Sequence, residues 1–247
     1  VTEPARRVAL VTGAAGGMGT AIVAALTRDG YDVVGVDVAP VTAPCLESHV
    51  LDVRHGSALR ALVVDVVARR GRLDAVVAAA AVVGGGAPLW TTPDSVLEEL
   101  WDVDAKGVWT TASATVPHLL ASPEPHLARF VGIASAAGEH GLFGLSAYTA
   151  VKHAVVGIVR GLAADLVGTG VSAVVVSPGA TRTPMLEATA ALYGLSGEAG
   201  IAELARHQGL RRPLDPAEVA EVVALCCSPA GAALNGSVVN ADGGFGI

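Results

Sequence analysis

A cluster of glycines near the start of the chain restricts the possible folds more than any other part of the sequence. It lies between residues 8–11, a β-branched run that predicts a strand, and a helical pattern through about Arg28. Glycines let the backbone turn tightly and approach a pyrophosphate, which the free N–H groups of a helix N-terminus favour. Glycines alone are also typical of a plain strand-to-helix turn, but the order strand, glycines, helix predicts a dinucleotide site. The stretch is Thr12-Gly13-Ala14-Ala15-Gly16-Gly17-Met18-Gly19, and the expected binding residues are Gly13, Gly17, Met18 and Gly19.

Strand and helix patterns alternate along the rest of the chain, without repeats or low-complexity linkers. A length of 247 residues with 52% hydrophobic residues suits one domain with a large core. The sequence therefore predicts a single α/β domain over residues 1–247, built on a doubly wound parallel sheet. Strands are expected at 8–11, 31–36, 49–53, 73–80, 130–134, 171–176 and 237–240, and helices at 56–69, 92–120, 146–167 and 215–227.

Two acidic residues follow the second and third expected strands. Asp37 lies about twenty positions beyond the glycines, where a carboxylate can accept hydrogen bonds from the adenosine ribose. The same charge repels a 2′-phosphate, and no Arg or Lys stands in the glycine loop or just after Asp37, so NAD is favoured over NADP. An ordinary turn residue is the alternative for Asp37 alone. Asp52 and Val53 end the third strand, where Asp52 can reach the adenine edge.

A phenol, an ammonium and a hydroxyl are expected to meet after the strand at 130–134. Ser135 follows that strand directly, and Tyr148 and Lys152 lie four residues apart on one helix face. A nearby positive charge favours ionisation of a phenol, so such a tyrosine can exchange a proton with an alcohol or carbonyl. A lone Tyr-x-x-x-Lys is more often structural, but the chain has only two lysines, Lys106 and Lys152, and one falls at this spacing. We therefore expect a catalytic group.

Charge and cysteine content exclude several classes of function. The net charge of -7 and the absence of a Lys/Arg cluster argue against nucleic acid or an anionic membrane as partner. The longest apolar run, residues 75–83, is too short to span a bilayer, and residues 1–7 lack the apolar core of a signal peptide. Three cysteines form no disulfide framework and suit the cytoplasm, and no metal-ligand spacing is present.

Residues from Met185 to about Gly209 mix small, apolar and glycine residues, which is typical of a mobile flap over a pocket. The tryptophans at 101 and 109 are expected to be core or subunit contacts rather than ligand platforms. Several residues can serve either as apolar pocket walls or as plain packing. They are His140, Phe143, Leu145, Met185, Leu186 and Leu192.

Together these motifs resemble the short-chain dehydrogenase/reductase family over nearly the whole chain. The resemblance rests on Thr12-Gly13-x-x-x-Gly17-x-Gly19, Asp52, Ser135, Tyr148, Lys152, Pro178-Gly179 and Thr183. It implies a Rossmann-type three-layer α/β/α fold with a seven-stranded parallel sheet, a nicotinamide cofactor, and a homotetramer. It also implies that Tyr148 is the acid/base, that Lys152 binds the nicotinamide ribose and lowers the tyrosine pKa, that Ser135 orients the substrate oxygen, and that Thr183 contacts the carboxamide.

Two positions depart from the family pattern. Ala78-Ala79-Ala80-Ala81 stands where the family usually has Asn-Asn-Ala-Gly. We expect altered local packing there, while backbone contacts to the cofactor, including those of Ala79, survive. Asp104 aligns with the helix asparagine that completes the family's proton relay. Its main chain can still serve that relay if the helix geometry holds, and its charge is expected to act on Lys152.

These observations favour reversible hydride transfer between NAD and a small apolar secondary alcohol or ketone, with Tyr148 as acid/base. Three alternatives stay open. One is a dehydrogenase coupled to the redox peptide mycofactocin, with tightly held NAD. Another is a reductase of 3-oxoacyl thioesters, although the acidic chain offers no obvious basic patch for a carrier protein. The third is a non-catalytic NAD-binding protein, because fold alone does not determine function.

Overall fold

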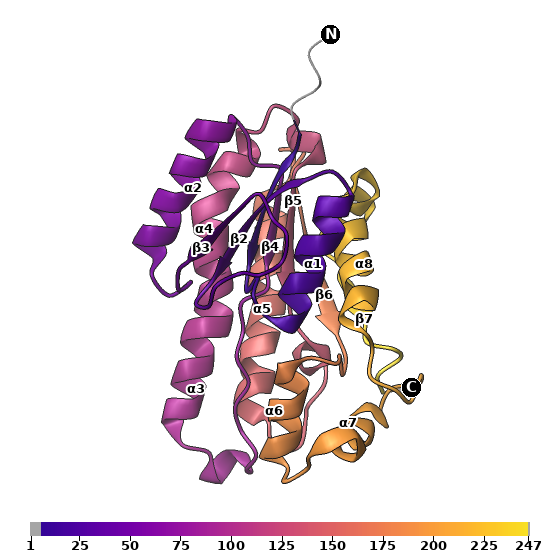
Figure 1. The fold of residues 1–247 in the computed structure, drawn as a ribbon. Coiled ribbons are helices and arrows are strands. Elements are labelled where there is room, and N and C mark those ends of the chain that lie inside the picture. The colour runs from indigo at the N-terminus through magenta and orange to yellow at the C-terminus, as the bar shows by residue number, and fades with distance from the viewer. Residues whose placement is uncertain (1–5, 247) are drawn as a thin grey trace.

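Seven parallel strands form one sheet in a computed structural model that describes residues 6–246 (Figure 1). Residues 1–5 and 247, which belong to the range expected to form the domain, lie outside the described residues. The strand order is β3-β2-β1-β4-β5-β6-β7. The strands are β1 (Val8–Thr12), β2 (Asp32–Asp37), β3 (Glu47–Val50), β4 (Ala75–Ala78), β5 (Arg129–Ile133), β6 (Ser172–Pro178) and β7 (Val238–Ala241).

Helices cover both faces of the sheet, as the alternating pattern predicts. Figure 1 shows α1 (Gly17–Arg28) and α8 (Pro216–Cys227) together on one face. The opposite face carries α2 (Gly56–Arg70), α4 (Lys106–Leu120) and α5 (Ser146–Asp165). Beyond the carboxyl ends of the strands lie α3 (Asp94–Leu100), α6 (Pro184–Leu192) and α7 (Gly197–Ala205). The Rossmann-type three-layer fold is therefore confirmed.

Alternating residues of the central strands belong to two separate cores. Leu10 and Val76 pack with the α2, α4 and α5 side, whereas Val11 and Val77 pack with the α1 and α8 side. Successive side chains of a strand point to opposite faces, so a strand covered on both sides must be apolar throughout. This explains why the central strands are mostly continuous hydrophobic runs, whereas β3 at the edge is Glu-Ser-His-Val and partly exposed.

The strand order reverses at β1, and this reversal positions the ligand site. The chain runs outward from β1 through β2 to β3, and then returns to place β4 on the other side of β1. Connections leave the neighbouring carboxyl ends of β1 and β4 in opposite directions, which opens a crevice between them. The glycine cluster follows β1, and the four alanines begin at the end of β4, so both border this crevice.

Several expected elements differ in detail from the structure; the strand expected at 73–80, for example, spans only Ala75–Ala78. The third strand was expected at 49–53 but spans Glu47–Val50, because Asp52 turns the chain by accepting a hydrogen bond from the Arg54 N–H at 2.9 Å. The helix expected over 92–120 is interrupted by one π-helical turn, Trp101–Ala105. The expected flap consists largely of two helices, α6 and α7. Among residues 6–246, no helix has the length and apolar character needed to cross a bilayer.

Candidate active site

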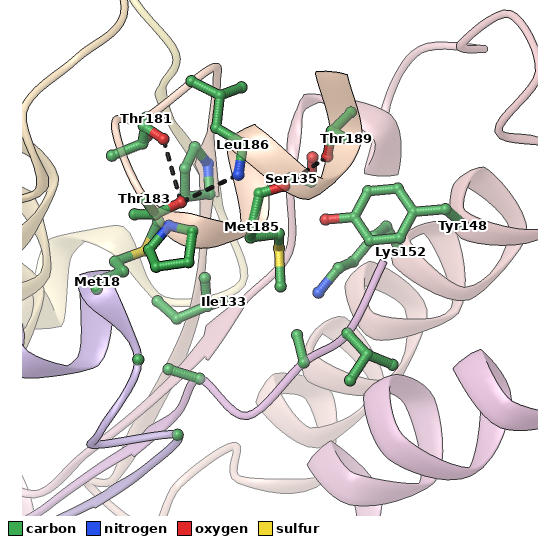
Figure 2. A pocket seen from close by; sticks show the side chains of 18 of the residues that line it. Met18, Ile133, Ser135, Tyr148, Lys152, Thr181, Thr183, Met185, Leu186 and Thr189 are labelled. Carbon is green, nitrogen blue, oxygen red and sulfur yellow. Dashed lines mark hydrogen bonds between the residues drawn. The ribbon is translucent and has the colours of Figure 1, made fainter. Parts of the chain in front are cut away.

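A cavity of about 1030 Å³ opens at the carboxyl ends of the strands. It extends from the glycine turn and Asp37 to the first turns of α5 and α6 (Figure 2). With the exception of Asp104, every residue predicted to bind cofactor or act in catalysis lines this cavity. They are Gly13, Gly17, Met18, Gly19, Asp37, Asp52, Val53, Ala79, Ser135, Tyr148, Lys152, Pro178, Gly179 and Thr183.

The glycine turn owes its shape to contacts that admit no side chain. Gly13 has φ of +71°, and a Cβ there would lie 2.7 Å from the backbone of Ala79. A Cβ at Gly19 would lie 1.9 Å from the Gly13 carbonyl oxygen. The turn therefore lies in close backbone contact with the chain after β4, and α1 begins at the edge of the cavity. The first turn of α1 has no acidic residue of its own, and the positive end of its dipole faces the cavity.

Asp37 is oriented by the backbone around it. Its Oδ2 accepts a hydrogen bond from the Ala15 N–H at 2.9 Å, and its Oδ1 accepts one from the Ala39 N–H at 3.0 Å. A carboxylate oxygen can accept more than one hydrogen bond, so both oxygens keep capacity for a ligand hydroxyl. The carboxylate therefore links the glycine turn to the end of β2 and presents a fixed negative charge to the cavity.

The turn after β3 contains a cation that the sequence reasoning missed. Arg54 lines the cavity and forms an ion pair with Asp52, with 2.6 Å between Arg54 Nη2 and Asp52 Oδ2. This hydrogen bond lowers the pKa of Asp52. The spacing Asp-x-Arg is a possible sequence signal, but only the turn geometry shows that both side chains face the same space. Val53 is buried beside them.

The chain after β4 is held by other side chains than the asparagines of the family pattern. The buried Thr12 Oγ1 accepts hydrogen bonds from the Ala79 and Ala80 N–H groups, at 3.2 and 3.4 Å. Farther along, Asp104 Oδ1 accepts one from the Val82 N–H at 2.9 Å. A hydroxyl from β1 and a carboxylate from the π-helical turn therefore hold the backbone of residues 79–82.

Ser135, Tyr148 and Lys152 meet on one wall of the cavity, as the spacing predicts. Ser135 caps a short 3-10 turn after β5, and its Oγ accepts a hydrogen bond from the Ala137 N–H at 3.2 Å. Tyr148 and Lys152 occupy successive turns of α5, with Lys152 Nζ 5.5 Å from the centre of the Tyr148 ring. Figure 2 shows the Tyr148 hydroxyl and Lys152 Nζ directed toward the same side of the cavity. Both side chains are buried.

Asp104 lies behind this wall rather than in the cavity lining. Its carboxylate is fully buried, and its Oδ2 lies 3.0 Å from Lys152 Nζ, which is 2% exposed. Burial raises the pKa of Asp104, although the ammonium opposes the rise. Burial acts to lower the pKa of Lys152, but the charges of Asp104 and Tyr148 outweigh it, so that pKa is raised. The expected action of Asp104 on Lys152 therefore takes the form of a buried ion pair.

The pKa of Tyr148 is raised above its usual value by the balance of four effects. Burial raises it, the Lys152 ammonium lowers it, the Asp104 carboxylate raises it again, and a hydrogen bond with Ser135 lowers it. Lys152 thus acts in the direction that the family resemblance implies. In the cofactor-free protein, however, burial together with Asp104 prevails.

The end of β6 connects the cavity to the two flap helices. A Cβ at Gly179 would lie 2.2 Å from Gln208 Oε1, so Pro178-Gly179 passes very close to the chain after α7. Thr183 caps α6: its Oγ1 accepts a hydrogen bond from the Leu186 N–H at 3.4 Å and donates one to the Thr181 carbonyl at 3.2 Å. The Thr183 methyl would lie 3.0 Å from a Cβ at Gly17, so the start of α6 rests on the glycine turn.

The remaining walls of the cavity are mostly apolar. Of the six expected wall residues, Phe143, Leu145, Met185 and Leu186 line it, and Met185 faces Tyr148 and Lys152 across the space (Figure 2). His140 and Leu192 do not line it; the His140 ring lies 5.5 Å from that of Phe245. The sequence reasoning did not single out several further wall residues, of which all but Phe245 lie in the expected flap. They are Thr189, Tyr193, Leu195, Leu204, His207 and Phe245.

Comparisons with known proteins agree with this geometry. A family model described as enoyl-(acyl carrier protein) reductase matches residues 13–246. A putative ketoacyl reductase of the monensin polyketide synthase from Streptomyces virginiae is 32% identical, covering 100% of this chain and 99% of the relative. (-)-trans-Carveol dehydrogenase from Rhodococcus erythropolis is 35% identical over 73% of each chain.

Solved structures show the same architecture. An actinorhodin polyketide ketoreductase with NADPH superposes with a TM-score of 0.88 at 30% identity, covering 98% of this chain and 97% of that one. A ligand-free aldohexose dehydrogenase from Thermoplasma acidophilum has a TM-score of 0.89 at 23% identity, covering 97% and 93%, and supports the fold alone. The family match, the full-length relatives and the shared fold agree, and the chain belongs to the short-chain dehydrogenase/reductase family of oxidoreductases.

Proposed function

We propose that this protein is an NAD-dependent oxidoreductase that transfers hydride between the nicotinamide and a small apolar secondary alcohol or ketone. The observation that carries the proposal is the convergence of Ser135, Tyr148 and Lys152 on a cavity whose other end is the glycine turn. Such a constellation places a proton donor beside the space where a substrate oxygen can bind. A relative named for an alcohol substrate, the carveol dehydrogenase, supports the same class of reaction.

The residues of the cavity fit a nicotinamide dinucleotide. The N-terminus of α1, whose first turn has no acidic residue, suits a pyrophosphate. The Asp37 carboxylate, which is held by the Ala15 N–H, suits ribose hydroxyls. The Asp37 charge would repel the 2′-phosphate of NADP, and Arg54 is already paired with Asp52. A relative from Sphingomonas is described as a dehydrogenase using NAD(+), whereas the actinorhodin ketoreductase was solved with NADPH. We favour NAD because of Asp37.

The bound nicotinamide supplies or accepts the hydride, and the side chains handle the proton and the binding. Tyr148 accepts the alcohol proton during oxidation and returns it to the carbonyl oxygen during reduction. Ser135 holds that oxygen by a hydrogen bond, and Lys152 binds the nicotinamide ribose while its charge favours the ionised phenol. Gly13, Gly17, Met18 and Gly19 bind the pyrophosphate, Asp52 and Val53 border the adenine, and Ala79, Pro178, Gly179 and Thr183 bind the nicotinamide half.

The substrate half of the cavity favours an apolar ligand. Phe143, Leu145, Met185 and Leu186 line it, and residues 185–209 serve as the flap that covers it. We further propose a cytoplasmic homotetramer formed by the single domain, with Trp101 and Trp109 at subunit contacts because they are 44% and 64% exposed. Light scattering of the purified protein measures the assembly.

The test is the Tyr148→Phe variant with a panel of apolar secondary alcohols and their ketones, including monocyclic terpenoid alcohols. We expect turnover to fall at least about a hundredfold, because the proton donor is lost, while NAD affinity stays within about threefold. Turnover close to that of the unchanged protein would refute the role of Tyr148. NAD binding without turnover on any member of the panel would instead favour a non-catalytic NAD-binding protein.

Reduction of 3-oxoacyl thioesters is a second candidate, because two Streptomyces relatives, at 32% and 33% identity, are described as putative ketoacyl reductases. The acidic chain, with a net charge of -7, does not favour an acidic carrier protein as partner. Comparing a 3-oxoacyl thioester with the corresponding free ketone separates the two candidates. Retention of NAD through extended dialysis identifies the alternative in which the cofactor stays bound between turnovers.

A further inference from the structure

The buried pair of Asp104 and Lys152 lies directly beneath the proposed proton donor. Asp104 belongs to the π-helical turn Trp101–Ala105, and its side chain has no exposed surface. π-helical turns insert an extra residue into a helix and commonly occur at functional sites. Here the turn brings a carboxylate within 3.0 Å of Lys152 Nζ, in a place that water does not reach.

Each carboxylate oxygen of Asp104 has a different partner. Oδ1 accepts the Val82 N–H at 2.9 Å, and Oδ2 faces the ammonium of Lys152. The residue therefore joins three segments of the site: the chain after β4, the π-helical turn and α5. Because a buried charge is strongly destabilising without a partner, the lysine and the carboxylate hold each other in place before any ligand binds.

The pair also changes the charge that Tyr148 experiences. An isolated ammonium beside a phenol would favour its ionisation, whereas an ammonium with a carboxylate at 3.0 Å is close to a neutral dipole. We propose that Asp104 is a positioning residue that fixes Lys152 and offsets its charge at Tyr148, so that carbonyl reduction persists at neutral pH and alcohol oxidation requires alkaline pH. This inference rests on the proposed function, since it concerns the same proton donor.

Among the charged groups near Lys152, Asp104 is the one that offsets the charge of its ammonium. Burial raises the pKa of Tyr148, and the charged groups that act on it are Lys152 and Asp104. The charged groups that act on Lys152 are Asp104 and Tyr148. Other titratable groups on neighbouring elements do not shift the pKa of these three. On the helix side they are Asp94, Glu98 and Glu99 of α3, and the pair Asp102–Lys106. The others are Glu139 and His140 after the 3-10 turn, His153 on α5, Glu203 and His207 in the cavity lining, His118 near the end of α4 and Arg129 at the start of β5.

The test compares Asp104→Asn with a matched control, Asp102→Asn. Asp104→Asn removes the negative charge while an amide oxygen can still accept the Val82 N–H. The control makes the same change two residues earlier in the same turn, where Asp102 pairs with Lys106 at the surface at 2.7 Å. The readout is the pH profile of kcat/KM, measured for oxidation of a turned-over secondary alcohol and for reduction of its ketone.

We expect Asp104→Asn to move the rising limb of the oxidation profile and the falling limb of the reduction profile to lower pH by at least about one unit, because an ammonium without its counter-charge lowers the pKa of a neighbouring phenol by such amounts. Asp102→Asn should leave both limbs in place. Profiles of Asp104→Asn that coincide with the unchanged protein, or that move to higher pH, overturn the inference. Turnover that survives Tyr148→Phe would instead refute the proposed function.

A direct titration covers the case in which Asp104→Asn does not fold. The ultraviolet difference between the unchanged protein and Tyr148→Phe isolates the ionisation of Tyr148 in the cofactor-free chain. Ionisation at or above the ordinary phenol pKa of about 10 is the outcome that the offset requires, with burial of the phenol acting in the same direction. Ionisation below that value shows that the Lys152 charge prevails, and refutes the inference without any activity measurement.

Discussion

Replacement of Gly19 by alanine tests whether the glycine turn is as tightly determined as its contacts indicate. A Cβ at Gly19 would lie 1.9 Å from the Gly13 carbonyl oxygen, 2.7 Å from its carbonyl carbon and 2.9 Å from the Ala14 Cα. Ordinary contact begins at about 3.4 Å, so the two backbone segments must separate by roughly 1.5 Å. All three contacts are backbone atoms, so no side chain can rotate away to relieve them.

The magnitude follows from that displacement. Alanine in a helix interior gains about 1 kcal/mol over glycine, but overpacking of this kind costs about 3 kcal/mol or more. A net loss of about 2 kcal/mol in a chain of this length lowers Tm by about 4–8 °C. A shift of more than 1 Å also takes the N–H groups of the turn out of hydrogen-bond range of a pyrophosphate. We therefore expect NAD affinity to fall at least tenfold, or about 1.4 kcal/mol.

Gly16→Ala is the matched control within the same turn. A Cβ at Gly16 would meet only the Gly13 carbonyl oxygen, at 3.3 Å, and the residue has an ordinary φ of -68°. Its free energy of unfolding should change by less than about 1 kcal/mol. Thermal unfolding and calorimetric NAD titration of both variants give the comparison. If Gly19→Ala melts and binds NAD like the unchanged protein, the reasoning from backbone contact is wrong.

Three further outcomes follow from the site. Asp37→Ala should raise KM for NAD at least tenfold and shift the NAD to NADP preference toward NADP, since it removes the fixed carboxylate; steady-state kinetics with both cofactors measures this. Lys152→Met should lower the free energy of unfolding by about 3 kcal/mol at neutral pH, because Asp104 stays buried without its cation. Adding Asp104→Asn to that variant should restore most of the lost stability, as measured by urea titration. The Asp104 pKa is raised in the folded protein, so this deficit should grow as pH rises above about 4 and shrink in acid, where the carboxyl takes up a proton. Tyr193→Phe removes the hydrogen bond donated to the Phe143 carbonyl, and should raise substrate KM by about fivefold with little change in kcat, together with faster hydrogen exchange in α6.

Local patterns in the sequence predicted most of the architecture. The β-branched run 8–11 with its glycines, and the apolar runs before Asp37 and Ser135, correspond to strands of the observed sheet. A strand buried on both faces must be apolar throughout, so these segments were recognisable without any knowledge of their neighbours. Helical spacing likewise indicated that Tyr148 and Lys152 share one face, and the structure places them there.

Contacts between distant segments could not be predicted in the same way. Thr12 accepts hydrogen bonds from residues 79 and 80, and Asp104 accepts one from Val82 and forms an ion pair with Lys152. The order of the strands in the sheet, rather than sequence spacing, brings these groups together. The π-helical turn at 101–105 leaves no signal in the apolar periodicity, because it adds one residue to a helix that continues beyond it. Arg54 and Phe245 reach the cavity only because the strand ends and the last turn of the chain converge there.

The contact between the Thr183 side chain and Gly17 has a consequence for engineering new specificity. Because α6 begins against the glycine turn, with 3.0 Å between the Thr183 methyl and the position of a Gly17 Cβ, the two segments form one mechanical unit. A flap taken from another member of the family and grafted at residue 184 would pack against a glycine turn whose shape does not match it. Transplants should therefore exchange residues 12–19 together with the segment that starts at 181, and selection for altered substrates should return paired changes in both.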